Sequence, residues 1–164
     1  MEKLARGKIS VDEAEKLLKL LLIQEVGNMA KLDIGREHRR GIPEIVLAEG
    51  KTPEDAVAIA SKLVDSSGKA ILSRTNNEHV KALQKKFQHD PSKSITIHES
   101  ARIAVIRSRD YHTDKSGGKV SILAAGTSDI PVAEEAKVIA EEMGCETVTA
   151  YDVGVAGIHR LFPA

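Results

Sequence analysis

The chain of 164 residues carries 24 Lys and Arg residues against 24 Asp and Glu residues, so its formal net charge at pH 7 is zero. A neutral chain with 2% aromatic residues disfavours nucleic acid as a partner, because phosphates need cations and bases need stacking surfaces. A hydrophobic content of 41% is sufficient for a core, and the apolar run 17–23 is too short to span a membrane. With no apolar leader and a single cysteine, we expect a cytoplasmic protein without membrane contact or internal disulfide.

The first predicted element is an amphipathic helix that begins at Ser10. Ser10 and Glu13 have the spacing of a capping box, and apolar residues then recur at helical spacing as far as Gly27. The recurring residues are Val11, Ala14, Leu17, Leu18, Leu21 and Leu22. Because this apolar face is uninterrupted, we expect it to pack in the core or against another copy.

Residues 30–44 form a charged stretch without periodicity, which predicts a loop. Asp33, Arg36 and Arg39 recur every third residue and would lie on one side of a helical turn. Such a group clamps a phosphate or carboxylate, or it forms a solvated ladder of salt bridges. Spacing alone favours the ladder.

The next part of the chain predicts a β-α-β-α order followed by two more strands. Thr52 and Pro53 are typical of a helix start, and Thr75 with Glu78 repeats the capping-box spacing. His98 is expected to be structural rather than a ligand. The predicted elements are strand 44–48, helix 53–64, strand 69–73, the helix that ends at Phe87, strand 94–98 and strand 102–107.

A polar, glycine-ended stretch then predicts a linker at 111–118, which would separate an N-terminal region, 1–110, from a second region, 119–164. The second region predicts strand 120–125, helix 131–143 and strand 146–151, which is one β-α-β crossover. Two strands and one helix are too few for a stable parallel sheet. We therefore expect strands of the first region, another chain or a further segment of a longer protein to complete the sheet.

Polar loops follow both strands of this crossover. Gly126, Thr127, Ser128 and Asp129 come directly after the first strand, and a glycine-rich loop with His159 and Arg160 follows the second. Ligands bind at the carboxyl ends of parallel strands, so the two loops predict one small-ligand site.

Each of these residues has both a functional and a structural interpretation. In the functional one, Arg160 binds a phosphate, Asp129 accepts hydrogen bonds from sugar hydroxyls and His159 transfers a proton. The alternatives are helix capping by Ser128 and Asp129, and a surface turn at His159 and Arg160.

The segments AAGTSDIPVAEEA and YDVGVAGIHRLF resemble the first half of the aminoimidazole ribonucleotide carboxylase fold. The upstream segment LDIGREHRRGIPEIVLAEGKT is similar to the carboxylase-related synthases of pyridinium-3,5-biscarboxylic acid mononucleotide, the precursor of the nickel-pincer cofactor. The resemblance implies an α+β region followed by the first β-α-β part of a flavodoxin-like parallel sheet. It also implies carboxylation of the pyridine ring of nicotinic acid adenine dinucleotide, with phosphoanhydride hydrolysis that releases AMP.

Carried onto this sequence, the resemblance places 126–129 at the nucleotide site, with His159 and Arg160 on the facing loop. It also favours a functional role for Asp33, Arg36 and Arg39 over the salt-bridge ladder. It implies carbon dioxide or bicarbonate as co-substrate, no tightly bound cofactor, room for a divalent metal ion and a homo-oligomer, commonly an octamer.

The family reaction uses a cysteine thiolate that adds to the pyridine ring. Cys145 does not match this cysteine, which lies later in the family domain, and its sequence context predicts a buried, inert thiol. We therefore expect this chain to be a truncated and catalytically incomplete portion of such an enzyme.

Two other functions stay open at this point. One is carboxylation of an aminoimidazole ribonucleotide in purine synthesis, although that resemblance begins only near Val120 and leaves the upstream region unexplained. The other is a nucleotide-binding module without catalysis.

Overall fold

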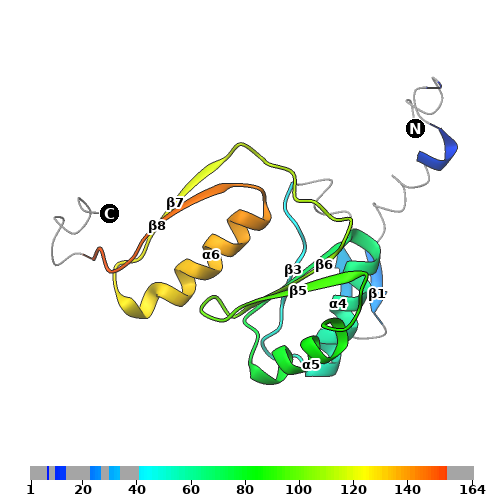
Figure 1. The fold of residues 1–164 in the computed structure, drawn as a ribbon, viewed down its shortest axis with the longest axis horizontal. Helices are drawn as coiled ribbons and strands as arrows, with labels where there is room; N and C mark the ends of the chain where they lie inside the picture. The colour runs from blue at the N-terminus through cyan, green and yellow to red at the C-terminus, as the bar shows by residue number, and fades with distance from the viewer. Residues whose placement is uncertain (1–6, 8–9, 14–22, 27–29, 34–40, 155–164) are drawn as a thin grey trace. The chain divides into compact units, whose positions relative to one another are not determined.

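A computed structural model describes residues 7, 10–13, 23–26, 30–33 and 41–154, and the chain divides into two compact units, Met1–Glu44 and Ile45–Ala164 (Figure 1). In the first unit, the capping box predicted at Ser10 is confirmed. Ser10 N donates to Glu13 Oε2 at 2.9 Å, and Glu13 N donates to Ser10 Oγ at 3.1 Å.

The first unit also contains a two-stranded antiparallel sheet where a helix end and a loop were predicted. Strand β1, Ile23–Val26, pairs with β2, Ala30–Asp33, so that Val26 lies opposite Ala30. The predicted helix is therefore wrong over 23–26, and the predicted loop is wrong over 30–33. Gly27 and Asn28, between the strands, are residue types of hairpin turns, and this local signal outweighs the helical spacing of the leucines.

The second unit contains a four-stranded mixed sheet in the order β3-β4-β6-β5. Its strands confirm the four predicted ones to within a residue or two: β3 is Ile45–Leu47, β4 is Lys69–Ser73, β5 is Lys93–His98 and β6 is Ile103–Ser108. Strand β3 pairs parallel with β4, whereas β6 pairs antiparallel with both β4 and β5. Helix α4, Pro53–Ser67, makes the crossover from β3 to β4.

The start of α4 is as predicted, and its end lies three residues later than the predicted Val64. The Oγ1 atom of Thr52 accepts a hydrogen bond from Asp55 N at 3.1 Å, and Pro53 occupies the first turn. The helix ends where Gly68 adopts φ = 80°. This conformation favours glycine and satisfies the last carbonyl groups of the helix.

Helix α5, Asn77–Phe87, is capped one residue later than predicted. Asn76 Oδ1 accepts from Glu78 N and His79 N, and His79 Nδ1 accepts in return from Asn76 N. The predicted capping box of Thr75 and Glu78 is therefore wrong. Thr75 instead donates from its N and Oγ1 atoms to the carbonyl oxygen of Arg102, which holds it at the end of the sheet.

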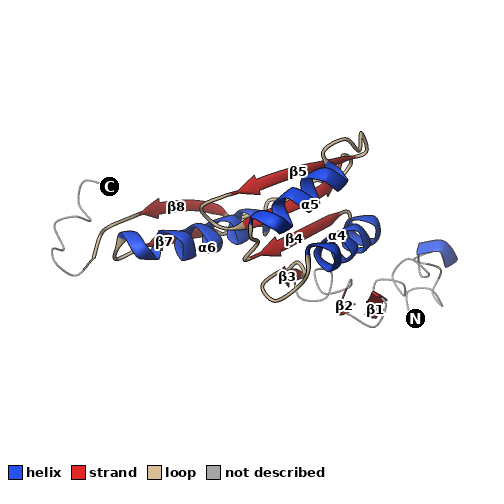
Figure 2. Ribbon diagram, turned by 90° about the horizontal axis from the view of Figure 1, so that it is seen from below, coloured by secondary structure: helices blue, strands red, loops and turns tan. Residues whose placement is uncertain are grey.

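Strand β4 is the centre of the core, and all five of its residues are buried. Ile71 belongs to an apolar cluster with Ile103 and Val105 of β6 and Val138 of α6, Ile130–Glu142. Because side chains alternate along a strand, Ala70 and Leu72 point to the other face, which α4 covers. Helices therefore cover both faces of the central strand, which explains its apolar centre, Ala70, Ile71 and Leu72 (Figure 2).

The predicted β-α-β crossover is confirmed. Strand β7, Lys119–Leu123, pairs parallel with β8, Glu146–Ala150, and α6 joins them. In the described residues this sheet has two strands and is separate from the four-stranded one, so the first region does not complete it by strand pairing. The α/β class is confirmed, with β7-α6-β8 following an α+β region.

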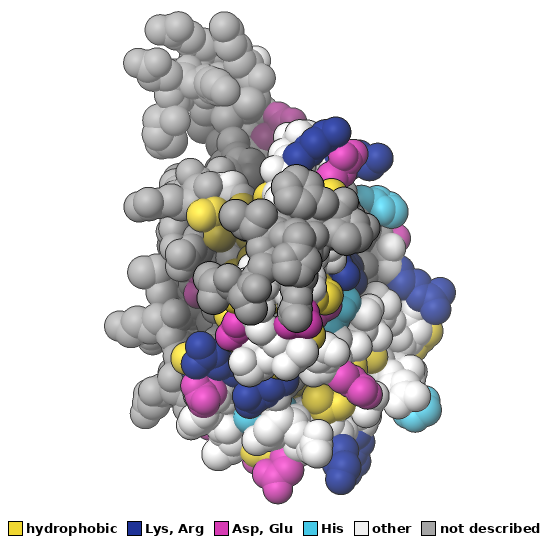
Figure 3. Space-filling view, turned by 90° about the vertical axis from the view of Figure 1, so that its left-hand side faces the viewer, with side chains coloured by type: hydrophobic (Ala, Val, Ile, Leu, Met, Phe, Trp, Pro, Cys, Tyr) yellow, Lys and Arg dark blue, Asp and Glu magenta, His cyan; other side chains and the backbone are white. Residues whose placement is uncertain are grey.

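No helix in the described part of the chain is long and apolar enough to cross a membrane. On the face shown in Figure 3, the described Lys and Arg side chains are interspersed with Asp and Glu side chains.

Candidate functional site

The candidate site lies at the carboxyl ends of β7 and β8, which are neighbours in a parallel pair. Beyond β7, Ala124 is buried at 3% exposure and continues the pairing, because its N–H donates to Ala150 O at 3.0 Å. The chain then leaves the sheet at Gly126, and a short 3-10 helix, Thr127–Asp129, leads directly into α6. The three side chains of this turn are exposed. The sequence GTSD thus forms the predicted strand-turn-helix junction.

Asp129 closes this turn. Its Oδ2 accepts a hydrogen bond from Gly126 N at 3.1 Å, and its N–H donates to Gly126 O at 3.0 Å. The bond from Gly126 N makes Asp129 a capping acceptor at the start of 127–129, which supports the capping interpretation for Asp129, whereas no side chain in the described part of the chain caps α6 at its own first residue. Ile130 N donates to Thr127 O and Pro131 has no N–H, so the main-chain N–H groups that an anion could meet at this junction are those of Thr127 and Ser128.

The backbone of the turn does not require glycine at position 126. Its φ of −136° suits any residue, and an added Cβ would meet Asp129 Oδ2 and Ser128 Oγ at 3.7 and 3.9 Å, which are ordinary contacts. The turn at 126–129 is therefore open to residues other than glycine at position 126. The remaining reason for glycine at this position, close approach of a ligand, stays a prediction.

The loop after β8 lies directly against the loop after β7. Val153 N donates to Ala124 O at 3.1 Å, and a Cβ atom on Gly154 would overlap the carbonyl oxygen of Ala125. Asp152, between the strand and this contact, adopts φ = 57°, which is uncommon for a residue other than glycine. The two strand-end loops, which we call the paired loops (124–129 and 151–154), therefore meet through main-chain contacts.

Tyr151 and Asp152 were not predicted as site residues. The Tyr151 hydroxyl group donates to Glu134 Oε1 and so ties the end of β8 to α6. Their position directly after a strand and before Val153 and Gly154 was the available sequence signal.

The other predicted site residues fall elsewhere. Asp33 is the last residue of β2, in the first unit, and Arg36, Arg39, His159 and Arg160 lie outside the described residues. Of the predicted set, the structure therefore brings together Gly126, Thr127, Ser128 and Asp129, beside the start of the second loop. Among the described residues, no group of three His, Cys, Asp or Glu side chains is placed to hold a metal ion.

Cys145 is not buried as predicted. Its thiol group is half-exposed, lies 3.3 Å from Ser116 Oγ and borders a pocket of about 240 Å³. Because Cys145 precedes β8 and the paired loops follow it, the five-residue strand separates the thiol from the loops by roughly 17 Å. Cys145 is therefore not part of the candidate site.

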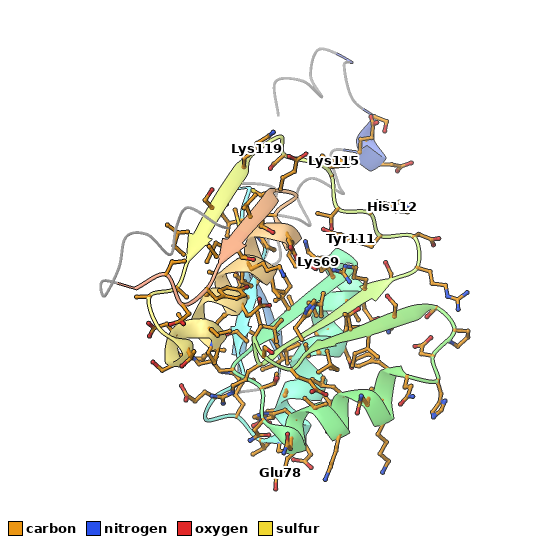
Figure 4. The ribbon with its side chains drawn as sticks, turned by 60° about the vertical axis from the view of Figure 1, so that its left-hand side comes forward. Lys69, Glu78, Tyr111, His112, Lys115 and Lys119 are labelled. Carbon is orange, nitrogen blue, oxygen red and sulfur yellow. The ribbon has the colours of Figure 1, made fainter. Side chains whose placement is uncertain are left out.

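A buried ionic cluster, which the sequence analysis missed, joins α6 to the four-stranded sheet. Lys69 Nζ donates to the main-chain oxygen of Glu142 at 2.9 Å and lies 5.0 Å from the centroid of the Tyr111 ring (Figure 4). Arg107 Nη2 donates to Glu142 Oε1. A lysine directly before the apolar residues Ala70, Ile71 and Leu72 was the one sequence signal.

Comparison with known proteins gives two matches. Residues 23–109 match the model of the LarB/PurE-like N-terminal domain. An uncharacterized protein of Methanocaldococcus jannaschii is 46% identical over 160 residues, which cover 96% of this chain. The chain spans 61% of the length of that relative.

Proposed function

The chain belongs to the LarB/PurE-like N-terminal domain family, and on that premise we propose that it binds a nucleotide at the paired loops as part of a nucleotide-carboxylating enzyme. The main-chain contact of the loops carries this proposal: Val153 N bonds Ala124 O, and Gly154 packs on Ala125. This contact fixes the GTSD turn next to the loop after β8, at the edge of a parallel pair where α/β proteins bind nucleotides.

The chemistry of the turn suits a phosphorylated ligand. The turn before α6 presents the main-chain N–H groups of Thr127 and Ser128, and N–H groups at a helix start bind phosphate. Thr127 and Ser128 add exposed hydroxyl groups, and Gly126 allows a ligand close to the backbone. Asp129, held by Gly126 N, is placed to accept from sugar hydroxyls with its remaining acceptor capacity.

We propose nicotinic acid adenine dinucleotide as the substrate, with carbon dioxide or bicarbonate as co-substrate and AMP as the released product. The match over 23–109 supports this choice over an aminoimidazole ribonucleotide, because it covers the upstream region that the resemblance to the purine enzyme leaves out. In this proposal His159 and Arg160 face the turn, and Asp33, Arg36 and Arg39 contribute to the same function. Cys145 has no part in it, because it lies at the opposite end of β8.

Calorimetric titration of residues 1–164 with nicotinic acid adenine dinucleotide, AMP and aminoimidazole ribonucleotide tests the proposal. We expect the dinucleotide and AMP to bind and the aminoimidazole compound to bind more weakly. Preference for the aminoimidazole compound would contradict the proposed substrate, and failure of all three compounds to bind would contradict a nucleotide site in this chain.

A further inference from the structure

A cavity away from the paired loops lies at the end of the four-stranded sheet, where β4 leads into α5 and β5 leads into β6. It has a volume of about 440 Å³, and its lining includes Thr75, Asn77, Val80, Ile97, His98 and Arg102. We propose that this cavity binds a small phosphorylated, hydroxyl-bearing molecule, of the size of a sugar phosphate, through the guanidinium group of Arg102. The proposal does not depend on the proposed nucleotide site.

Arg102 is held in place by four hydrogen bonds. Its carbonyl oxygen accepts from Thr75 N at 2.8 Å and from Thr75 Oγ1 at 3.0 Å, and its N–H donates to Glu99 O at 3.0 Å. Its side-chain Nε donates to Thr75 O at 3.3 Å. Thr75 is itself buried at 3% exposure. The backbone and the base of the guanidinium group are therefore fixed before any ligand arrives.

The two Nη nitrogens of Arg102 have no hydrogen-bond partner among the described residues, and the residue borders the cavity. A planar guanidinium group with its Nε fixed presents these remaining donors as a fork, which matches two oxygens of a phosphate or carboxylate group. The guanidinium group of Arg102 is therefore oriented to bind an anion before the anion arrives.

The backbone of Arg102 is strained. Its φ is 53°, in the left-handed region that glycine adopts without cost. Arg74, on the other side of Thr75, has φ = 52°, and Asp152 at the paired loops is the third such residue in the described part of the chain. Strained residues that their surroundings hold firmly are concentrated at binding sites. Glycine would relieve the strain at position 102. The presence of arginine there therefore suggests that its side chain has a function, which we assign to ligand binding.

The rest of the lining selects for hydroxyl groups beside the anion. Asn77 and Glu99 are exposed and offer an amide and a carboxylate, whereas Val80 and Ile97 are half-buried and form an apolar wall. A carboxylate repels a second anionic group and accepts from hydroxyls, which favours a sugar phosphate over a polycarboxylate. The volume fits a small ligand rather than a bare phosphate ion.

The start of α5 does not provide free main-chain N–H groups that could bind the anion in place of Arg102. Asn76 Oδ1 already accepts from Glu78 N and His79 N, so the helix start is capped by its own residue. Arg102 is the lining residue with a fixed guanidinium fork, so replacing this one side chain tests the proposal.

The test is calorimetric titration of the full chain with ribose 5-phosphate, and with citrate as the carboxylate comparison. Arg102→Gly removes the guanidinium group while it relieves the backbone strain. Arg74→Gly is the matched control, because it relieves the same strain and removes an arginine that pairs with Glu49 at 3.1 Å and does not line the cavity.

We expect wild-type protein to bind ribose 5-phosphate, Arg102→Gly to weaken this binding at least about tenfold, and Arg74→Gly to leave it unchanged. The unfolding midpoints of both variants should equal or exceed that of the wild type. Asn77→Ala, at an exposed position, should also weaken binding.

Three results would overturn the proposal. They are no binding of ribose 5-phosphate at millimolar concentration, equal affinity of wild type and Arg102→Gly, and binding of citrate in preference to the sugar phosphate.

Discussion

The ammonium group of Lys69 donates a hydrogen bond of 2.9 Å to the main-chain oxygen of Glu142, although the two residues lie 73 positions apart. The bond joins the first residue of the central strand β4 to the last residue of α6, the helix that begins at the GTSD turn. Both side chains are almost fully buried, at 2% and 5% exposure. A cation at the carboxyl end of a helix also stabilises the helix dipole. The cluster therefore fixes α6 against the sheet.

The first prediction concerns this buried contact. Lys69→Met should lower the free energy of unfolding by about 3 kcal/mol, because it leaves the buried carboxylate of Glu142 with one cation fewer. Lys119→Met is the control, since Lys119 pairs with Glu146 at 3.5 Å while both side chains are more than 70% exposed, and it should cost less than about 1 kcal/mol. Urea unfolding of both variants gives the comparison. Equal losses would mean that the buried cluster does not stabilise the fold.

The second prediction concerns the contact between the paired loops. Gly154→Ala should destabilise the protein by about 2 kcal/mol and weaken nucleotide binding, because the new Cβ would overlap the carbonyl oxygen of Ala125 and push the loops apart. Gly126→Ala should keep the stability of the wild type, since its new Cβ makes only ordinary contacts. Thermal unfolding followed by circular dichroism measures both variants. A Gly154→Ala protein as stable as the wild type would show that the loops are not held together as described.

The third prediction separates binding from capping at Asp129. Asp129→Ala should cost about 1 kcal/mol of stability through the lost bond to Gly126 N, and it should weaken nucleotide binding by more than about tenfold. Thr52→Ala is the matched control, because Thr52 Oγ1 likewise accepts one main-chain N–H, at 3.1 Å, at the start of α4. The control should lose similar stability and keep its affinity. If both variants keep their affinity, Asp129 is only a structural residue.

The fourth prediction concerns the half-exposed thiol. Cys145→Ala should leave nucleotide affinity unchanged, because the length of β8 separates Cys145 from the paired loops. Calorimetry on the variant measures this, with Cys145→Ser as a control that keeps a polar group beside Ser116. Loss of affinity in both variants would place the thiol in the site.

Sequence reasoning found the elements whose signals are local. Thr52 with Pro53 marks the start of α4, and the apolar strands on both sides of α6 mark the crossover. It was wrong at β1 and β2, where helical spacing of leucines extends into a segment that pairs across a hairpin. This pairing is local, and its sequence signal is the pair of turn residues Gly27 and Asn28, which the helical spacing obscured.

The site was predictable in outline only. The polar turn after β7 is visible in the letters GTSD, but the role of Asp129 in closing that turn depends on a hydrogen bond to Gly126. The hydrogen bonds between Thr75 and Arg102 and the contact between Lys69 and Glu142 connect residues far apart in the sequence. No local pattern encodes such contacts.

The most direct test of the nucleotide site is an amide chemical-shift titration of the isotope-labelled chain with AMP. We expect shifts at Gly126, Asp129, Val153 and Gly154, and we expect the same shifts in the Arg102→Gly variant. Shifts confined to Thr75 and Arg102, or no shifts at all, would contradict a nucleotide site at the ends of β7 and β8.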